Sequence, residues 1–450
     1  MNQSQSFYLL SLGCPKNLVD SEGIATLLRR AGYAPAPSPE AADLLIVNTC
    51  GFIESAREES REILRELART KQPGQRIIAA GCYSQRCPNE LIEAIPSIDG
   101  LIGTRRWMDI VDLIEQLEDE VEHRPPPNPI CHVPDVERMG QDTRGIVRAA
   151  IQGGSAYLKI AEGCRRACAF CAIPLIKGPT VSRPPDAILT DARQLAEYGV
   201  KEIILIAQDI TDYGHDLQIE DGLEKLLEQL LTAVPDIPWI RLMYTFPGYV
   251  TESLIQLMAS EPQILPYLDM PLQHADQRIL RSMRRPNDIT SVRQTLANIR
   301  RKVPQVALRT TFIVGYPGED ETAYQNLIHF VQAVQFDHVG VFSYSFEPGT
   351  PAEHLGNPIP GQVKTERIEH LMAVQAEISL DRNQKFIGKT LDVLIEGVDQ
   401  ENQISIGRSY RDAPEIDGLV LIEDAAPIGE MVRVKINSAI THDLVGRLVS

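Results

Sequence analysis

Short apolar runs alternate with amphipathic stretches through the first hundred residues. Three runs are typical of strands and two stretches are typical of helices: residues 7–13, 43–48 and 76–80, and residues 18–31 and 55–70. A further helix is expected to begin at Pro88, because proline suits the first helical position. Strands that are separated by helices favour a parallel, doubly wound sheet.

A second alternating series begins near residue 156. Its six expected strands are residues 157–161, 202–207, 239–244, 267–270, 308–314 and 338–342. Helical patterns lie between them, for example at residues 186–198, 223–232, 289–302 and 322–334. Six such units are too few for a closed eight-fold barrel, so we expect an open partial barrel with its chemistry at the C-terminal ends of its strands.

The pattern changes at both ends of this series. The proline-rich run at residues 124–129 indicates a linker before it, because prolines disfavour helices and cannot donate to a sheet. After a long helix at residues 363–386, short alternating runs and turn signals predict a small all-β barrel. We therefore expect four segments: an N-terminal domain at 5–118, a linker at 119–152, a central core at 153–382 and a β-domain at 383–450.

Composition narrows the functional classes. The 450 residues carry a formal net charge of −17, which argues against a general phosphate-binding surface and suits a basic partner. No apolar run is long enough to span a bilayer and the first six residues are too polar for a signal peptide, so we expect a cytoplasmic protein without membrane contact. In that compartment, the eight cysteines suit metals or catalysis better than disulfides.

Three cysteines form a dense motif directly after the first strand of the central core. Cys164, Cys168 and Cys171 have the spacing CxxxCxxC. Three thiolates at this spacing can hold three irons of a cubane cluster and leave the fourth iron open. The alternative is a structural zinc ion with Cys131 as its fourth ligand, although a loop at the C-terminal end of a barrel strand is an unusual place for one.

Three more cysteines are dispersed along the N-terminal sheet. Cys14, Cys50 and Cys82 each follow one predicted strand. Because ligands collect outside the carboxyl ends of parallel strands, these thiols are expected to converge on a second metal site. The alternative is three buried cysteines that act as small apolar residues. Cys87 and Cys131 remain, and we interpret both as thiols that bind no metal.

With these two cysteine triads, nearly the whole chain resembles the methylthiotransferases of the radical S-adenosylmethionine superfamily. The middle is similar to the radical barrel of that family, and the end is similar to its TRAM domain. Five short segments resemble the RimO branch, which modifies an aspartate of the twelfth small-subunit ribosomal protein: residues 11–22, 48–53, 266–274, 407–409 and 413–418. The tRNA-modifying MiaB branch usually carries Gln-Met in place of Pro15 and Lys16. The chain departs from the family pattern at Lys177, where arginine is commoner, and at Met243.

The resemblance implies two 4Fe-4S clusters and S-adenosylmethionine. Cys164, Cys168 and Cys171 would hold the cluster that binds S-adenosylmethionine and generates a radical. Cys14, Cys50 and Cys82 would hold the auxiliary cluster that delivers sulfur. Together they would place a methylthio group on the β-carbon of an aspartate, a carbon without an easily removed proton. These six cysteines are the expected metal-binding and catalytic residues.

Seven further residues are expected to contact the cofactor. Phe170 follows the cysteine motif, Arg183 is a candidate partner for a carboxylate, and Gln208 and Asp209 end a barrel strand. The glycine-containing turn at 315–319 contributes Gly315, Gly318 and Glu319. The alternatives are core packing for Phe170, a surface ion pair for Arg183 and helix capping for Gln208 and Asp209. For the residues of the turn, the alternative is a simple strand-to-helix connection. His274 is a further candidate that contacts either substrate or a structural partner.

The expected partners are a basic ribosomal protein of the small subunit, free or within the ribosome, an electron donor and a sulfur donor. From residue 383 to the C-terminus there are seven basic and eleven acidic residues, a net charge of −4. This charge argues against stable nucleic-acid binding. Two alternatives stay open: a tRNA methylthiotransferase with the same machinery, and a non-catalytic iron–sulfur electron carrier.

Overall fold

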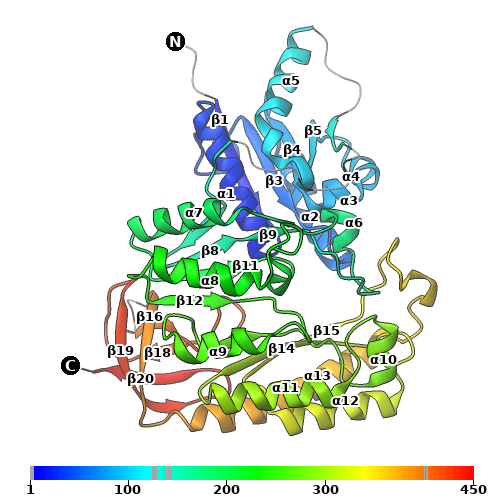
Figure 1. The fold of residues 1–450 in the computed structure, drawn as a ribbon. Helices are drawn as coiled ribbons and strands as arrows, with labels where there is room; N and C mark the ends of the chain where they lie inside the picture. Colours follow the sequence, from blue (N-terminus) through cyan, green and yellow to red (C-terminus); the bar gives the residue numbers. More distant parts are fainter. Residues whose placement is uncertain are drawn as a thin grey trace.

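The computed structural model describes residues 5–123, 129–134, 136, 139, 144–399, 401 and 404–449. An N-terminal α/β unit lies above a half barrel in Figure 1, and a small β-barrel lies beside the lower strands at the C-terminal end of the chain. Most of the predicted proline-rich run, residues 124–128, lies outside the described residues. Within the described part of the chain, no helix combines the length and apolar character needed to cross a membrane.

The N-terminal unit is built on six parallel strands in the order β2-β1-β3-β4-β5-β6. The strands are β1 (Ser6–Ser11), β2 (Ala34–Pro35), β3 (Leu44–Thr49), β4 (Arg76–Gly81), β5 (Gly100–Gly103) and β6 (Ile130–His132). Five helices and two 3-10 turns connect them: α1 (Pro15–Arg30), η1 (Pro39–Ala41), α2 (Glu54–Thr70), α3 (Cys82–Arg86), α4 (Pro88–Ala94), η2 (Thr104–Asp109) and α5 (Ile110–His123). Every residue of β3 is buried, as expected for a strand covered on both faces.

The N-terminal sheet extends into the segment expected to be a linker. Helix α5 continues to His123, and β6 pairs in parallel with β5. Strand β7 (Ala149–Gln152) then pairs antiparallel with the first strand of the half barrel. This segment therefore contains two sheet strands as well as the connecting chain.

The central unit is a half barrel of six parallel strands. Three of them form one sheet in the order β12-β11-β8, with the antiparallel β7 at its edge, and the other three form a sheet in the order β13-β14-β15. A parallel bridge between Ile240 and Ile264 joins the two sheets. The strands are β8 (Ser155–Lys159), β11 (Glu202–Ile206), β12 (Trp239–Leu242), β13 (Tyr267–Asp269), β14 (Ala307–Val314) and β15 (His338–Ser343). All six predicted strands are present.

Helices cover the outer face of the half barrel, with the longest, α13, at the base of Figure 1. They are α7 (Pro185–Glu197), α8 (Gly222–Ala233), α9 (Glu252–Ser260), α10 (Gln277–Ser282), α11 (Ile289–Lys302), α12 (Glu321–Val334) and α13 (Gly361–Gln384). The short α6 (Ile173–Lys177) lies instead against α3 and η2 of the N-terminal unit (Figure 1). The smaller elements are β9 (Ala161–Glu162), β10 (Val181–Ser182), η3 (Ile210–Asp212) and η4 (Glu353–Leu355). The apolar sides of α7, α8, α9, α11, α12 and α13 pack with the strands in one continuous core.

The C-terminal unit is a closed five-stranded barrel in the order β16-β17-β18-β20-β19. Its strands are β16 (Thr390–Asp399), β17 (Ile404–Ser409), β18 (Val420–Ile422), β19 (Met431–Ala439) and β20 (Leu444–Leu448). Closure leaves no open sheet edge. The predicted fold class, with a parallel sheet, a half barrel and a small β-barrel, is confirmed.

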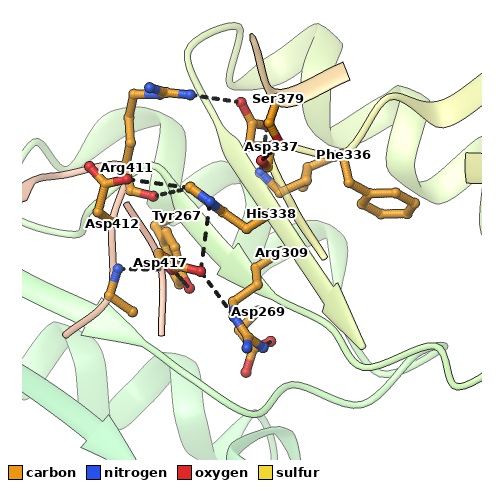
Figure 2. Close-up of polar contacts among 12 residues, drawn as sticks. Tyr267, Asp269, Arg309, Phe336, Asp337, His338, Ser379, Arg411, Asp412 and Asp417 are labelled. Carbon is orange, nitrogen blue, oxygen red and sulfur yellow. Dashed lines mark hydrogen bonds and ion pairs between the residues drawn. The ribbon is translucent and has the colours of Figure 1, made fainter. Parts of the chain in front are cut away.

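Buried charges join the small barrel to the N-terminal ends of the half-barrel strands. Asp417, in the loop after β17, accepts a hydrogen bond of 2.7 Å from the Tyr267 hydroxyl and lies 3.2 Å from Arg309 Nε (Figure 2). Nearby, Glu202 is paired with Arg241 and Arg408 at 2.6 Å each. Burial alone would raise the pKa of Glu202, but the two guanidinium groups outweigh it and lower the pKa to about 2.

We predict that Glu202→Gln lowers the free energy of unfolding by about 3–5 kcal/mol, because it leaves Arg241 buried without a counter-charge. Urea denaturation measures this loss. The exposed Glu197→Gln on α7 is the matched control and should change stability by less than about 0.5 kcal/mol. An equal loss in both variants would contradict the interpretation.

Candidate functional site

The first cysteine triad lies along the carboxyl edge of the N-terminal sheet. Cys14 follows β1 and caps α1, Cys50 follows β3, and Cys82 begins α3 directly after β4. These three strands are neighbours in the sheet, so their ends bring the thiols together. A Cβ atom at Gly13 would lie 2.9 Å from Cys50 Cβ, so glycine permits this close approach.

The second triad lies in the loop between β9 and α6. Backbone N–H groups of Arg166 and Ile173 donate to the sulfurs of Cys164 and Cys171 at 3.4 and 3.5 Å. Arg285 Nη1 donates to Cys168 Sγ at 3.6 Å. Hydrogen bonds to the sulfurs are a recognised feature of iron–sulfur sites, where they adjust the potential.

Both triads line the same cavity, which has a volume of about 330 Å³. It lies between the N-terminal sheet and the C-terminal ends of the half-barrel strands. Its remaining wall includes aromatic side chains such as Phe170, Tyr244 and Phe246. The six thiols therefore border one shared space.

The thiols fit iron–sulfur clusters better than a single metal ion. Each set offers three soft sulfur ligands, and within the described chain no three His, Cys, Asp or Glu side chains converge as one metal ion would require. A cluster distributes its thiolates over different irons, so its ligands need not meet at one point. Burial raises the pKa of both Cys82 and Cys171 to about 12, which means that these thiols need a bound metal to become thiolates at neutral pH.

The other two cysteines lie elsewhere. Cys131 is exposed on β6, with its Sγ 3.6 Å from the Pro129 carbonyl oxygen, and Cys87 lies between α3 and α4. Neither lines the cavity. The structure therefore does not provide Cys131 as the fourth ligand of a zinc ion at the second triad.

Three of the seven predicted cofactor contacts line the cavity. They are Phe170, Gln208 and Asp209. The Gln208 Oε1 atom is buried without a hydrogen-bond partner, so it is available to a ligand. Asp209 accepts from the Thr211 backbone N–H at 3.0 Å and pairs with Arg166 at 2.7 Å, so it both caps η3 and fixes the cysteine loop.

The other four predicted contacts lie outside the cavity lining. Arg183 donates to the Lys159 carbonyl oxygen and to Asp191 at 2.7 Å each. Glu319 accepts from the Gly315 N–H and pairs with Arg367, as part of the turn that also contains Gly318. The side chains of Arg183 and Glu319 are therefore engaged in contacts within the protein at this end of the barrel.

His274, the further candidate, lies between β13 and α10 and contacts the same turn. It is fully buried, and its Nε2 lies 3.2 Å from Glu319 Oε2. Its Nδ1 accepts from the Asp276 backbone N–H at 2.9 Å, so both ring nitrogens have partners within the protein.

Sequence reasoning missed four cations that line the cavity: Lys16, Arg166, Lys177 and Arg285. Burial would lower the pKa of Lys177, but Asp20 and Glu162 outweigh it and raise the pKa. For Lys16, burial dominates and lowers the pKa. Lys16 and Arg166 lie two residues from a triad cysteine, and that position was the available signal for them. Lys177 was noted only as a departure from the family pattern, and no motif marks Arg285.

Buried ion pairs connect the two units around the cavity. Asp20, on α1, pairs with Lys159 at 2.6 Å, with Arg148 at 2.9 Å and with Lys177 at 3.1 Å. Glu162 pairs with the same three cations.

A second group of ion pairs connects the two units at another position. Glu347 of the central unit pairs with Arg57 and Arg86 of the N-terminal unit at 2.7 Å each. The relative position of the two thiol triads is therefore held by charges that lie away from water.

Comparison with known proteins agrees with this three-part organisation. Residues 6–103 match the uncharacterized protein family UPF0004, residues 158–331 match the radical SAM superfamily and residues 387–449 match the TRAM domain. The ribosomal protein uS12 methylthiotransferase RimO of Chloroflexus aurantiacus is 46% identical, over 99% of this chain and 100% of its own length. RimO of Aquifex aeolicus is 43% identical, over 98% of this chain and 96% of its own.

Solved structures share the fold at low sequence identity. The radical S-adenosylmethionine methyltransferase TsrM from Kitasatospora setae, which has cobalamin and a [4Fe-4S] cluster bound, superposes with a TM-score of 0.56. It is 14% identical, and the match covers 87% of this chain and 81% of TsrM. This similarity concerns the fold alone.

We predict that Cys50→Ala and Cys168→Ala each remove one of two clusters. Each variant should retain about half of the iron and sulfide of the reconstituted protein, because the two triads are separate ligand sets. Iron and sulfide analysis with Mössbauer spectroscopy measures this. Cys131→Ala is the control and should retain all of the iron, since Cys131 is exposed and away from the cavity. Full retention in either triad variant would contradict the assignment.

Proposed function

The chain belongs to the RimO family of ribosomal protein uS12 methylthiotransferases, and on that premise we propose that it places a methylthio group on the β-carbon of an aspartate of that ribosomal protein. The observation that supports this proposal most directly is that both thiol triads line one cavity. A substrate carbon bound in this cavity would lie between the site proposed to generate a radical and the site proposed to deliver sulfur. The enzyme is a radical S-adenosylmethionine methylthiotransferase.

Each triad is proposed to hold one 4Fe-4S cluster. Cys164, Cys168 and Cys171 would hold the cluster that binds S-adenosylmethionine, and the triad of the N-terminal sheet would hold the auxiliary cluster. When bound, these groups supply reductive cleavage of the S-adenosylmethionine sulfonium to a carbon radical, and a site from which methylated sulfur is delivered. Hydrogen-atom abstraction suits a β-carbon that carries no acidic proton.

The chain itself contributes positioning. The guanidinium carbon of Arg166 lies 3.6 Å from the ring centre of Tyr249, while its Nε is paired with Asp209, which fixes the loop that carries the second triad. Arg285 lies 4.0 Å from the ring centre of Phe246 and also reaches Cys168. Arg166, Arg285 and Phe246 line the cavity, so these stacked contacts hold its wall beside the second triad in place.

Among the cofactor contacts, we propose Phe170 for the adenine and Gln208 with Asp209 for the ribose or amino group of S-adenosylmethionine. All three line the cavity beside the second triad. The unpartnered Gln208 Oε1 is the best-supported of these contacts, because a buried acceptor without a donor is otherwise unfavourable.

The partner is proposed to be the basic ribosomal protein itself, free or within the small subunit, with separate donors of electrons and sulfur. The net charge of −4 on the C-terminal segment suits a basic protein better than tRNA. The relatives at 42–46% identity also carry the ribosomal-protein name, which favours this substrate over a tRNA nucleoside. The electron-carrier alternative offers no use for a substrate-sized cavity between the two triads.

We predict that ribosomal protein uS12 from cells with the gene carries the mass of one methylthio group in place of a hydrogen, and that uS12 from deletion cells lacks it. Mass spectrometry of the intact protein and of its peptides measures the difference. Methylthio-nucleosides of tRNA should be equal in the two strains. An unchanged aspartate mass, or a loss of the tRNA nucleoside alone, would contradict the proposed substrate.

Loss of a cysteine from each triad should abolish a different part of the reaction. Cys168→Ala is predicted to abolish formation of deoxyadenosine, because it removes the radical-generating site. Cys50→Ala is predicted to retain deoxyadenosine formation and to lose sulfur transfer. Chromatography of the reduced reaction mixtures measures both products, and sulfur transfer by the Cys50 variant would contradict the auxiliary role.

A further inference from the structure

Lys16 is a buried cation without a counter-ion at the wall of the cavity. Its side chain is 9% exposed, and it lines the cavity two residues after Cys14. Within the described part of the chain, no hydrogen bond or ion pair joins its ammonium group to another residue. Lys16 Nζ lies over the ring of Tyr244, 3.3 Å from its centre.

The other three cations of the cavity are engaged by the protein. Arg166 is paired with Asp209, and Lys177 is bonded to Asp20 and to Thr104 Oγ1 at 3.1 and 2.7 Å. Arg285 donates to the Pro271 carbonyl oxygen and to Cys168 Sγ. Asp209 is the one carboxylate in the lining, and it is used by Arg166. Arg166 Nη2 and Arg285 Nε also lack a hydrogen-bond partner, but both guanidinium groups are held by the other contacts just described. Within the described residues, Lys16 is the cavity cation whose donors are all available to a ligand.

The position of Lys16 is fixed from two sides. It lies in the first turn of α1, which Cys14 caps and Pro15 begins. Below it, Tyr244 adopts a left-handed backbone conformation with φ of 66°. Such a conformation is rare outside glycine and persists only where its surroundings impose it. The Tyr244 N–H donates to Asp269 Oδ2 at 3.1 Å, which supplies part of that constraint.

The support under Tyr244 continues into the C-terminal barrel. Arg309 Nη1 lies 3.0 Å from Asp269 Oδ1, and Arg309 Nε lies 3.2 Å from Asp417 Oδ1 (Figure 2). The platform of Lys16 is thus held by a chain of ion pairs that crosses two units. A rigid platform keeps the ammonium group in one place without neutralising it.

We propose that Lys16 binds the side-chain carboxylate of the target aspartate and determines the preference for aspartate. This inference rests on the proposed function. The β-carbon that reacts is bonded directly to that carboxylate, so placing the carbon between the triads brings the carboxylate into the cavity. A carboxylate taken out of water requires a cationic or hydrogen-bonding partner, and an ammonium group offers three donors. Among the four cations that line the cavity, Lys16 is the one with no hydrogen bond or ion pair to another described residue.

The test compares the ribosomal protein uS12 with its own variant in which the target aspartate is replaced by asparagine. Asparagine keeps the shape of the side chain and removes its charge. Dissociation constants of both proteins are measured with S-adenosylmethionine present, for the wild-type enzyme, Lys16→Gln, Lys16→Met and Lys16→Arg. Lys225→Gln, an exposed lysine on α8, is the matched control. The ratio of the two constants within one preparation cancels differences in cluster content, and it requires no turnover.

The wild-type enzyme and Lys225→Gln are expected to prefer the aspartate protein by about tenfold or more, as a charge-assisted hydrogen bond in a desolvated site would give. Lys16→Gln and Lys16→Met should bind the two proteins within about threefold of each other. Lys16→Arg should keep most of the preference.

Two outcomes would overturn the proposal. One is an undiminished preference in both neutral variants, and the other is the absence of any preference in the wild-type enzyme. The neutral variants could also bind S-adenosylmethionine more weakly while they keep the preference for aspartate. That result would overturn the proposal in the first way, and it would assign Lys16 to the carboxylate of the cofactor. Failure of the proposed function is distinguishable, because the wild-type enzyme would then leave the mass of uS12 unchanged.

Discussion

Asp20 and Glu162 lie between three cations, Lys159, Lys177 and Arg148, at the boundary of the N-terminal sheet and the half barrel. All five residues are at least 95% buried. Charges in such a place are stable only while they remain paired, so moving one unit relative to the other would leave charges unpaired away from water. This network therefore constrains the distance between two cysteine triads that belong to different units. The cavity, its wall and the proposed chemistry all depend on that constraint.

Much of the fold follows from the sequence because its signals are local. The strands of the half barrel are apolar runs between amphipathic helices. The cysteines of the first triad follow parallel strands whose carboxyl ends share an edge, and those of the second triad lie in one loop. The short strands β5 and β6 have four and three residues and carry too little pattern to be predicted. They form because neighbouring strands offer them hydrogen bonds, which is a property of the assembled sheet.

The site was less predictable, since the use of a side chain depends on partners that are distant in the sequence. Arg183 and Glu319 resemble ligand contacts in their loops, yet Asp191 and Arg367 engage them in the folded chain. Lys16 shows the reverse. Nothing near it in the sequence reveals that it lacks a counter-ion, because its neighbour Tyr244 is more than two hundred residues away. The spacing of the motifs thus identifies the thiols from the sequence. The ion pairs of the folded chain are needed to see which cation is left unpaired and can bind a substrate.

The central claim is that one substrate carbon meets both triads in a single cavity. The most direct measurement uses uS12 that carries deuterium on the β-carbon of its aspartates and follows the label by mass spectrometry. The account predicts that deuterium appears in deoxyadenosine with the wild-type enzyme and with Cys50→Ala, while the methylthio group appears on the same residue only with the wild-type enzyme. Methylthiolated uS12 formed without deuterium in deoxyadenosine would contradict it.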